Sequence, residues 1–283
     1  MGIKADLHIH TNASDGSETP ESVVNQAADA GLDLIAVTDH DATANVDAAR
    51  KAGEAVKLPV ISGVEFSVAH ENELHILGYF MDAEHPDLKA YIQRTREARD
   101  KRIVQYVDRL TESGIRLDLA VIRKQADGAM LSRAHLAEAM LEAGYVTTFA
   151  QAFKEYLGRG AETYIEKEKI DKKDCIELIA KCGGLSVWAH PVYHMDENFG
   201  DLLDDLLSYG LNGLEAYHPD HTDAVAETLD KLAQKKAMLV TCGSDYHGRV
   251  KPEIAIGSET RGGEYLDYCL NLFYQKATKG QNK

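Results

Sequence analysis

The sequence is poor in cysteine and has no long apolar run. Its 283 residues include only four cysteines, which stand far apart at positions 175, 182, 242 and 269. This spacing fits neither a disulfide framework nor a zinc ribbon, so a reducing compartment is expected. No stretch of about 18 apolar residues is present, and the first residues lack the apolar segment of a signal peptide. We therefore expect a cytoplasmic protein without a membrane partner.

Basic side chains are also in short supply. The chain has 31 Lys and Arg against 46 Asp and Glu, which gives a net charge of −15. A protein that binds long nucleic acids along its surface needs the opposite balance, so we expect no DNA partner. Residues 88–173 differ from the rest because they contain 17 basic and 13 acidic side chains. The balance therefore leaves room for short anionic ligands at this central segment.

The order of the predicted elements indicates an α/β fold. Short apolar runs typical of buried strands alternate with helical segments, except from Pro86 to about Gly160, where the pattern is almost wholly helical. Such alternation predicts a parallel sheet with helices outside it, and about seven strands suit a barrel. We predict a barrel domain at residues 1–85 and 172–283, interrupted by a helical insertion domain at residues 86–171.

Most of the 12 histidines fall where a predicted strand ends. His8 and His10 close the first strand, His40 closes the second, and His190 closes a later one. In a barrel of parallel strands, the carboxyl ends of the strands meet at one mouth. Residues that are distant in the sequence are therefore expected to form one cluster.

The spacing of these residues points to metal binding. His8 and His10 are two residues apart, so both imidazoles lie on the same side of a strand and can reach one metal ion. Asp15 adds a carboxylate from the following loop, and Asp6 on the same strand face could orient an imidazole. Glu215, at the end of a later strand, is a second candidate for a residue that lies behind the ligands. The alternative is a set of buried neutral imidazoles, but the number of strand-end residues favours a metal centre. Nitrogen and oxygen ligands without thiolate suit Mn²⁺, Fe²⁺ or Zn²⁺.

Several segments carry a family resemblance. The early ones are Asp6-Leu7-His8-Ile9-His10-Thr11, Ser14-Asp15-Gly16 and Thr38-Asp39-His40-Asp41. The later ones are Gly63-Val64-Glu65, His75-Ile76-Leu77-Gly78-Tyr79, Ala189-His190-Pro191 and Gly243-Ser244-Asp245-Tyr246-His247. In this order they resemble the polymerase and histidinol phosphatase (PHP) superfamily. Two segments of the insertion, residues 131–137 and 156–160, are similar to the branch with 3′,5′-nucleoside bisphosphate phosphatases and a 5′-to-3′ exoribonuclease.

The resemblance implies a distorted (β/α)7 barrel of the PHP type, with a helical insertion domain and three divalent metal ions per chain. Carried over by motif, the first ion would be held by His8, His10, Glu65 and Asp245. The second would be held by Asp15, His40 and His247, and the third by His75 and His190 with Glu65 bridging. The family favours Mn²⁺, with Fe²⁺ or Zn²⁺ as the alternatives.

Such a centre is expected to hydrolyse a phosphate monoester directly. Metal ions lower the pKa of a bridging water and place the resulting hydroxide in line with phosphorus. The Gly-x-Ser-x-Gly and P-loop motifs are absent, so a covalent intermediate is not required. His194 and His221 are candidates for the general acid that protonates the leaving group, and each could instead be an ordinary hydrogen-bonded histidine.

Substrate binding is predicted chiefly in the insertion. Ser132, Arg133 and His135 lie at an expected helix start, where free backbone amides favour an anion. The guanidinium of Arg133 adds a fork for a second phosphate. Further candidates for substrate contact are Arg159, Tyr164, Lys167 and His218. The basic run at residues 94–102 is either a guide for an oligonucleotide or the solvated face of a helix.

Three functions are consistent with these features. The first is a phosphatase acting on a small nucleotide, with the 3′-phosphate of nucleoside 3′,5′-bisphosphates as the expected target. The second is a 5′-to-3′ exoribonuclease acting on short RNA. The third is a non-catalytic nucleotide-binding module, against which the complete set of ligand residues argues. Hydrolysis of histidinol phosphate is disfavoured by the Ser132-Arg133-x-His135 motif.

Overall fold

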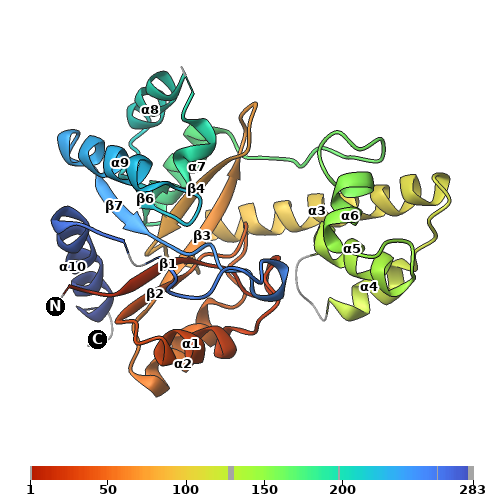
Figure 1. Ribbon diagram of the computed structural model, residues 1–283, viewed down its shortest axis with the longest axis horizontal. Helices are drawn as coiled ribbons and strands as arrows, with labels where there is room; N and C mark the ends of the chain where they lie inside the picture. The colour runs from red at the N-terminus through yellow and green to blue at the C-terminus, as the bar shows by residue number, and fades with distance from the viewer. Residues whose placement is uncertain (1, 127–130, 197, 260, 280–283) are drawn as a thin grey trace. The chain divides into compact units, whose positions relative to one another are not determined.

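A computed structural model describes residues 2–126, 131–196, 198–259 and 261–279 (Figure 1). The chain forms two compact units. The first combines Met1–Lys89 with Lys169–Lys283, and the second is Ala90–Glu168. Among the described residues, no helix is long and apolar enough to cross a membrane. All four cysteines are buried and free.

The first unit is built on a sheet of seven strands whose order follows the sequence. The strands are β1 (Ala5–Ile9), β2 (Leu34–Val37), β3 (Val60–Val68), β4 (Leu74–Tyr79), β5 (Leu185–Trp188), β6 (Gly213–Tyr217) and β7 (Leu239–Cys242). The two edges of the sheet approach each other just beyond β1 and β7. There the amide of His10 donates to the carbonyl oxygen of Tyr246, and the amide of Asp245 donates to that of His8, both at 2.9 Å. The nearly closed barrel confirms the predicted fold class.

Strand β4 departs from the expected parallel sheet. It pairs antiparallel with both β3 and β5, whereas the other neighbouring strands are parallel. The reason is the connection, because only residues 69–73 separate β3 from β4 and a parallel crossover needs a dozen or so. The reversal has a consequence for His75. This residue lies near the beginning of β4 and is nevertheless paired with Ser67, close to the carboxyl end of β3.

Helices cover the outside of the sheet, as alternation predicts (Figure 1). They are α1 (Pro20–Asp29), α2 (Val46–Val56), α7 (Lys172–Lys181), α8 (Phe199–Ser208), α9 (Asp223–Lys235) and α10 (Glu264–Lys279), with short 3₁₀ turns at Pro191–His194 and Gly248–Val250. Local signals explain α1. The Thr19 side chain accepts from the Ser22 amide, Pro20 occupies the first turn, and Gly31 follows the helix with a φ of 72°.

The second unit is helical and has its own core. Its elements are α3 (Pro86–Glu112, which begins in the first unit), α4 (Leu119–Gln125), α5 (Arg133–Glu142), α6 (Phe149–Ala152) and a π-helical turn at Phe153–Leu157. The buried residues include Tyr106, Leu136 and Met140. The basic run on α3 is not simply a solvated face. Arg99 is only 8% exposed, and two guanidinium nitrogens of Arg102 donate to the Ile165 carbonyl.

Candidate metal centre

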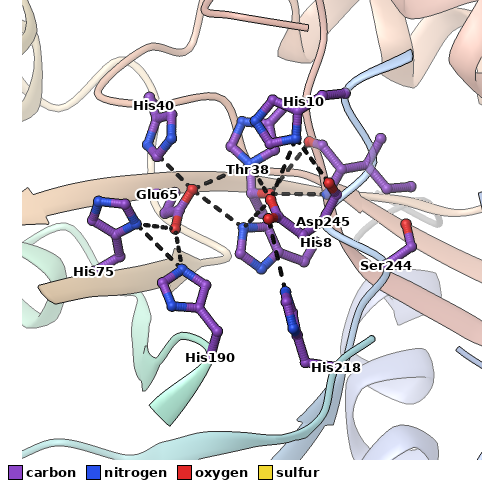
Figure 2. A network of polar contacts seen from close by, with 12 residues as sticks. His8, His10, Thr38, His40, Glu65, His75, His190, His218, Ser244 and Asp245 are labelled. Carbon is purple, nitrogen blue, oxygen red and sulfur yellow. Dashed lines mark hydrogen bonds and ion pairs between the residues drawn. The ribbon is translucent and has the colours of Figure 1, made fainter. Parts of the chain in front are cut away.

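The structure brings all nine predicted metal ligands together at the barrel. Figure 2 labels His8, His10, His40, Glu65, His75, His190 and Asp245 among them. His8 and Glu65 lie within β1 and β3, His75 lies near the beginning of β4, and the others lie in the segments that follow β1, β2, β5 and β7. Eight of the nine form three groups, and within each group the ligand atoms lie within 4.8 Å of one another. The ninth, His190, lies 3.1 Å from Glu65. Only Asp15 and His40 are partly exposed, and the other seven are buried.

The first group contains His8, His10, Glu65 and Asp245. The Nε2 atoms of His8 and His10 lie 3.2 and 3.1 Å from Glu65 Oε2. The same two nitrogens lie 3.5 and 3.2 Å from Asp245 Oδ1. Two imidazoles and two carboxylates therefore point at one small space, and this set has the same members as the set that the family resemblance implies for the first ion.

The second group contains Asp15, His40 and His247, and it also includes His10. His247 Nε2 lies 3.4 Å and His40 Nε2 3.8 Å from the Asp15 carboxylate. His10 Nδ1 lies 3.6 Å from Asp15 Oδ1, while its Nε2 faces the first group. The ring of His10 therefore separates two adjacent spaces, each lined by its own ligands.

Glu65 lies at the centre of the cluster (Figure 2). Its Oε2 faces His8, His10 and His40, the last at 3.1 Å from Nδ1. Its Oε1 faces His75 Nδ1 at 2.7 Å and His190 Nε2 at 3.1 Å. A carboxylate whose two oxygens face different imidazoles has the geometry of a bridging ligand. The third group, formed by His40, Glu65 and His75, differs from the expected one in including His40, with His190 beside it.

Several buried nitrogen and oxygen atoms of the cluster indicate whether metal ions fit here. His8 Nε2, both ring nitrogens of His10, and Glu65 Oε2 make no hydrogen bond, although they lie close to one another. Buried polar atoms are normally hydrogen-bonded, so atoms that converge without bonding are suited to a shared cation. The nitrogen and oxygen donor set suits Mn²⁺, Fe²⁺ or Zn²⁺. These residues could therefore hold more than one divalent ion.

The buried carboxylates of the cluster also require a positive charge close to them. Burial raises the pKa of the Glu65 carboxyl, but the imidazoles of His40, His75 and His8 outweigh burial and hold that pKa well below its usual value. Burial lowers the pKa of His10, but Asp245 and Glu65 outweigh it and raise that pKa to about 10. Without metal, a proton on His10 supplies the cation that the carboxylates need. A metal ion would compete with that proton.

Glu215 is the residue that orients an imidazole. Its Oε1 lies 3.1 Å from His8 Nδ1, and its Oε2 accepts a hydrogen bond from the His190 amide at 2.8 Å. The sequence offered Asp6 for orienting an imidazole, which was wrong, and Glu215 as a residue behind the ligands, which agrees with these contacts. Asp6 accepts from the backbone amides of His8, Ser244 and Gly257 instead. A carboxylate that holds the second ring nitrogen of a ligand fixes its tautomer and direction.

Two of the candidate ligands adopt unusual backbone conformations. His190 and Asp245 have positive φ angles of 31° and 54°, which are uncommon for residues other than glycine. Each lies just beyond a strand, and the bonds to Glu215 and to the His8 carbonyl hold their amides. Strained backbone of this kind concentrates at functional sites. It directs these side chains into the cluster.

The structure gives the two predicted general acids other contacts. His194 Nε2 bonds to the carbonyl oxygen of Glu73 at 2.9 Å, and its ring packs against His70 and Trp188. His221 Nδ1 bonds to the Ala216 carbonyl at 2.8 Å, which leaves Nε2 as an acceptor. Burial lowers the pKa of both imidazoles. Among the described residues, neither histidine makes a hydrogen bond, ion pair or ring contact with any of the nine ligands, so the structure offers no support for an acid role.

His218 and Lys251 instead face a ligand of the cluster. His218 Nδ1 accepts from the Asp220 amide at 3.1 Å, so its proton resides on Nε2, which lies 3.7 Å from Asp245 Oδ2 (Figure 2). The Lys251 ammonium lies 2.5 Å from the same oxygen. Sequence reasoning proposed His218 only as a substrate contact and missed Lys251. The available signal was its position four residues after His247, directly after a short turn.

The remaining predicted substrate residues lie in the second unit. Ser132 caps α5, and its amide donates to His135 Nδ1 at 3.1 Å, so these two residues bond to each other. Arg133 donates from Nη1 to the Leu157 carbonyl at 3.0 Å, and its guanidinium lies over the rings of Phe153 and Tyr164. Arg159 is exposed. Lys167 lines a cavity of about 210 Å³ together with Arg99 and Arg102.

Three characterised proteins are similar along most of the chain. A phosphoribosyl 1,2-cyclic phosphate 1,2-diphosphodiesterase of Eggerthella lenta is 36% identical over 253 residues, which cover 86% of this chain and 94% of that protein. A 5′-3′ exoribonuclease of Haemophilus influenzae is 34% identical over 250 residues, covering 87% and 91%. A 3′,5′-nucleoside bisphosphate phosphatase of Chromobacterium violaceum is 31% identical over 253 residues, covering 86% of each chain.

Structural and family comparisons agree with this similarity. A solved structure from Bifidobacterium adolescentis superposes with a TM-score of 0.84 at 30% identity, covering 95% of this chain and 96% of that one. Residues 6–180 match the family described as the PHP domain. Since the match includes the segments that supply His8, His10, Glu65 and His75, the chain belongs to the PHP domain family of metal-dependent phosphoesterases.

Proposed function

We propose that the protein is a phosphatase that hydrolyses a phosphate monoester of a small nucleotide, with the 3′-phosphate of nucleoside 3′,5′-bisphosphates as its target. The observation that carries this proposal is Glu65, whose two oxygens face five imidazoles in a buried cluster. Divalent ions, three per chain with Mn²⁺ as the first choice, would supply activated water and neutralise phosphate charge when bound. The similarity to the nucleoside bisphosphate phosphatase supports the substrate class.

The chain's own residues have distinct roles in this proposal. Glu215 holds His8 and the backbone of His190 in place, and the depressed pKa of the Glu65 carboxyl keeps it anionic. His218 presents an N–H toward the cluster, so we assign it, rather than His194 or His221, to contact the substrate or its leaving group. No nucleophilic serine or cysteine is needed, because hydrolysis is direct.

Arg133 is proposed to bind the second phosphate. One of its nitrogens donates a hydrogen bond to the Leu157 carbonyl, and the guanidinium lies over the Phe153 ring. A guanidinium anchored in this way loses little freedom on binding an anion, and a forked pair of N–H donors matches a phosphate. Tyr164, Arg159 and Lys167 remain proposed substrate contacts in the same unit.

A 5′-to-3′ exoribonuclease acting on short RNA is the second candidate. The similarity to the Haemophilus influenzae enzyme favours it, and so do Arg99, Arg102 and Lys167 around one cavity. The convergence of the nine candidate side chains on one buried cluster argues against a non-catalytic module.

A substrate panel tests the proposal. Phosphate release should be measured with added Mn²⁺ on adenosine 3′,5′-bisphosphate, AMP, histidinol phosphate, phosphoribosyl 1,2-cyclic phosphate and 5′-phosphorylated oligoribonucleotides. We expect the highest kcat/KM on adenosine 3′,5′-bisphosphate. Preferred release of mononucleotides from the oligoribonucleotides would establish the exoribonuclease instead. Absence of turnover on every compound by metal-loaded protein would reject both enzymatic functions.

A further inference from the structure

The two oxygens of Asp245 face different partners. Oδ1 points toward His8 and His10, with Nε2 atoms at 3.5 and 3.2 Å. Oδ2 receives the ammonium of Lys251 at 2.5 Å, and His218 Nε2 lies 3.7 Å from it. An ion held through Oδ1 would therefore leave the contact between Oδ2 and Lys251 in place. Lys251 can therefore add a positive charge to the cluster without taking the place of any residue that would hold a metal ion.

The backbone fixes the position of Lys251. Its amide donates to the Gly248 carbonyl and its own carbonyl accepts from the Ile254 amide, both at 3.1 Å. The preceding turn is attached to Ser17, whose hydroxyl accepts from the Arg249 amide at 2.8 Å. Gly248 has a φ of 65°, and a Cβ there would lie 2.2 Å from Ser17 Oγ, so this close approach requires glycine. The turn that follows the ligand His247 therefore also fixes the position of Lys251.

Lys251 remains charged in this environment. A lysine side chain is protonated at neutral pH, and the adjacent Asp245 carboxylate favours that positive charge. The side chain is 39% exposed, so it is accessible from solvent. An ammonium has three donors, and the bond to Asp245 uses one of them. Lys251 can therefore keep Asp245 and donate to an incoming anion at the same time.

We propose that Lys251 binds a terminal oxygen of the substrate's phosphate and thereby makes the site selective for phosphate monoester dianions over diester monoanions. This inference rests on the proposed phosphatase function and deepens it. A monoester has three terminal oxygens and carries close to two negative charges at neutral pH, because its second pKa is about 6. A diester has two terminal oxygens and one charge. One extra cation and donor beside the metal ligands therefore benefits the monoester more.

Matched variants and matched esters test this role. Lys251→Met removes the ammonium, and Lys251→Arg keeps the charge. Lys236→Met is the control, since Lys236 is similarly exposed, at 35%, and pairs with Asp204 at 2.9 Å on the outside of the barrel unit. The substrates are p-nitrophenyl phosphate and bis(p-nitrophenyl) phosphate, which share a leaving group. The metal content of each variant and the Kd of inorganic phosphate for the Mn²⁺-loaded protein are measured alongside.

We expect Lys251→Met to lower kcat/KM on the monoester by about 10- to 150-fold, the effect of one lost hydrogen bond to a charged group, and to lower it much less on the diester. The Kd of phosphate should rise by a similar factor. Lys251→Arg should retain most of the activity, and Lys236→Met should match the unaltered protein. Metal content should not change in any variant.

Other results would overturn the inference. Equal losses on both esters, or loss of bound metal, would show that Lys251 acts only by holding Asp245. Unchanged kinetics on both esters would show that it has no role. If the unaltered protein hydrolyses neither these esters nor any compound of the substrate panel, the proposed function fails, but the phosphate measurement still decides on Lys251. An unchanged Kd in Lys251→Met would then reject it.

Discussion

Replacing Glu215 by glutamine is the sharpest test of how the cluster is held. Both carboxylate oxygens of Glu215 accept hydrogen bonds, one from the His8 ring at 3.1 Å and the other from the His190 amide at 2.8 Å. Glutamine has the same shape but offers one acceptor oxygen and one donating NH₂ group. In Glu215→Gln, one of the two protein N–H groups must therefore face another donor. The variant disturbs a ligand without opening a cavity.

The size of the effect follows from that lost bond. A hydrogen bond to a charged group contributes about 1.5–3 kcal/mol, and about 1.4 kcal/mol corresponds to a factor of ten. Loss of a carboxylate that orients a metal-bound histidine costs about 10- to 100-fold in metal affinity or activity. We therefore expect Glu215→Gln to raise the Mn²⁺ concentration needed for half-maximal activity by about 10- to 100-fold. Activity should recover at saturating Mn²⁺.

The assay is a Mn²⁺ titration of phosphate release, combined with chelator competition to measure metal affinity directly. Glu227→Gln is the control, because Glu227 lies exposed on α9 in an ion pair with Lys231. Circular dichroism of the metal-free variants establishes that both are folded. If folded Glu215→Gln shows the same Mn²⁺ dependence and affinity as the control, His8 does not depend on Glu215 and the reasoning is refuted.

Three further predictions concern the cluster and the helical unit. His10→Ala should abolish turnover in a folded protein, because the two nitrogens of His10 face two groups of ligands; near-normal phosphate release at saturating Mn²⁺ would contradict this. Arg133→Ala should lower kcat/KM by about 10- to 150-fold on adenosine 3′,5′-bisphosphate and much less on AMP, which lacks the second phosphate. Arg133→Lys should recover only part, and equal losses on both substrates would assign Arg133 to the fold or to the scissile phosphate. In the metal-free protein, nearby carboxylates outweigh burial and raise the pKa of His10 to about 10 and of His75 to about 9, above the value of about 6.5 in an unfolded chain. Their stabilisation is therefore complete below about pH 6.5 and is lost as the pH rises through these values, so the melting temperature should fall between about pH 8 and pH 10; a constant melting temperature there would count against this account.

Much of the fold and of the ligand set could be predicted from local patterns. Alternating apolar runs and helical segments predicted the barrel, which the structure forms from seven strands. The histidines at strand ends predicted one cluster, because parallel strands bring their carboxyl ends to the same mouth. The family resemblance then assigned each ligand to one of three metal ions. In the structure, each of the nine side chains lies close to at least one other of them. Which ion each ligand holds remains a prediction.

Other features depended on contacts between distant segments. Strand β4 runs antiparallel because its connection to β3 is short, and this reversal places His75 opposite Ser67 and beside Glu65. Asp6 was expected to hold an imidazole, but three backbone amides surround it.

By itself, the sequence determined the order of the elements, the residue types at the strand ends and hence the chemistry of the centre. These properties depend on near neighbours along the chain, where periodicity and capping act. Only the tertiary structure decided that Glu215 holds His8 from 207 positions away and that Lys251 faces one oxygen of Asp245. Such pairings depend on barrel closure and on buried carboxylates finding partners, and a linear pattern does not encode which partner lies within hydrogen-bond distance.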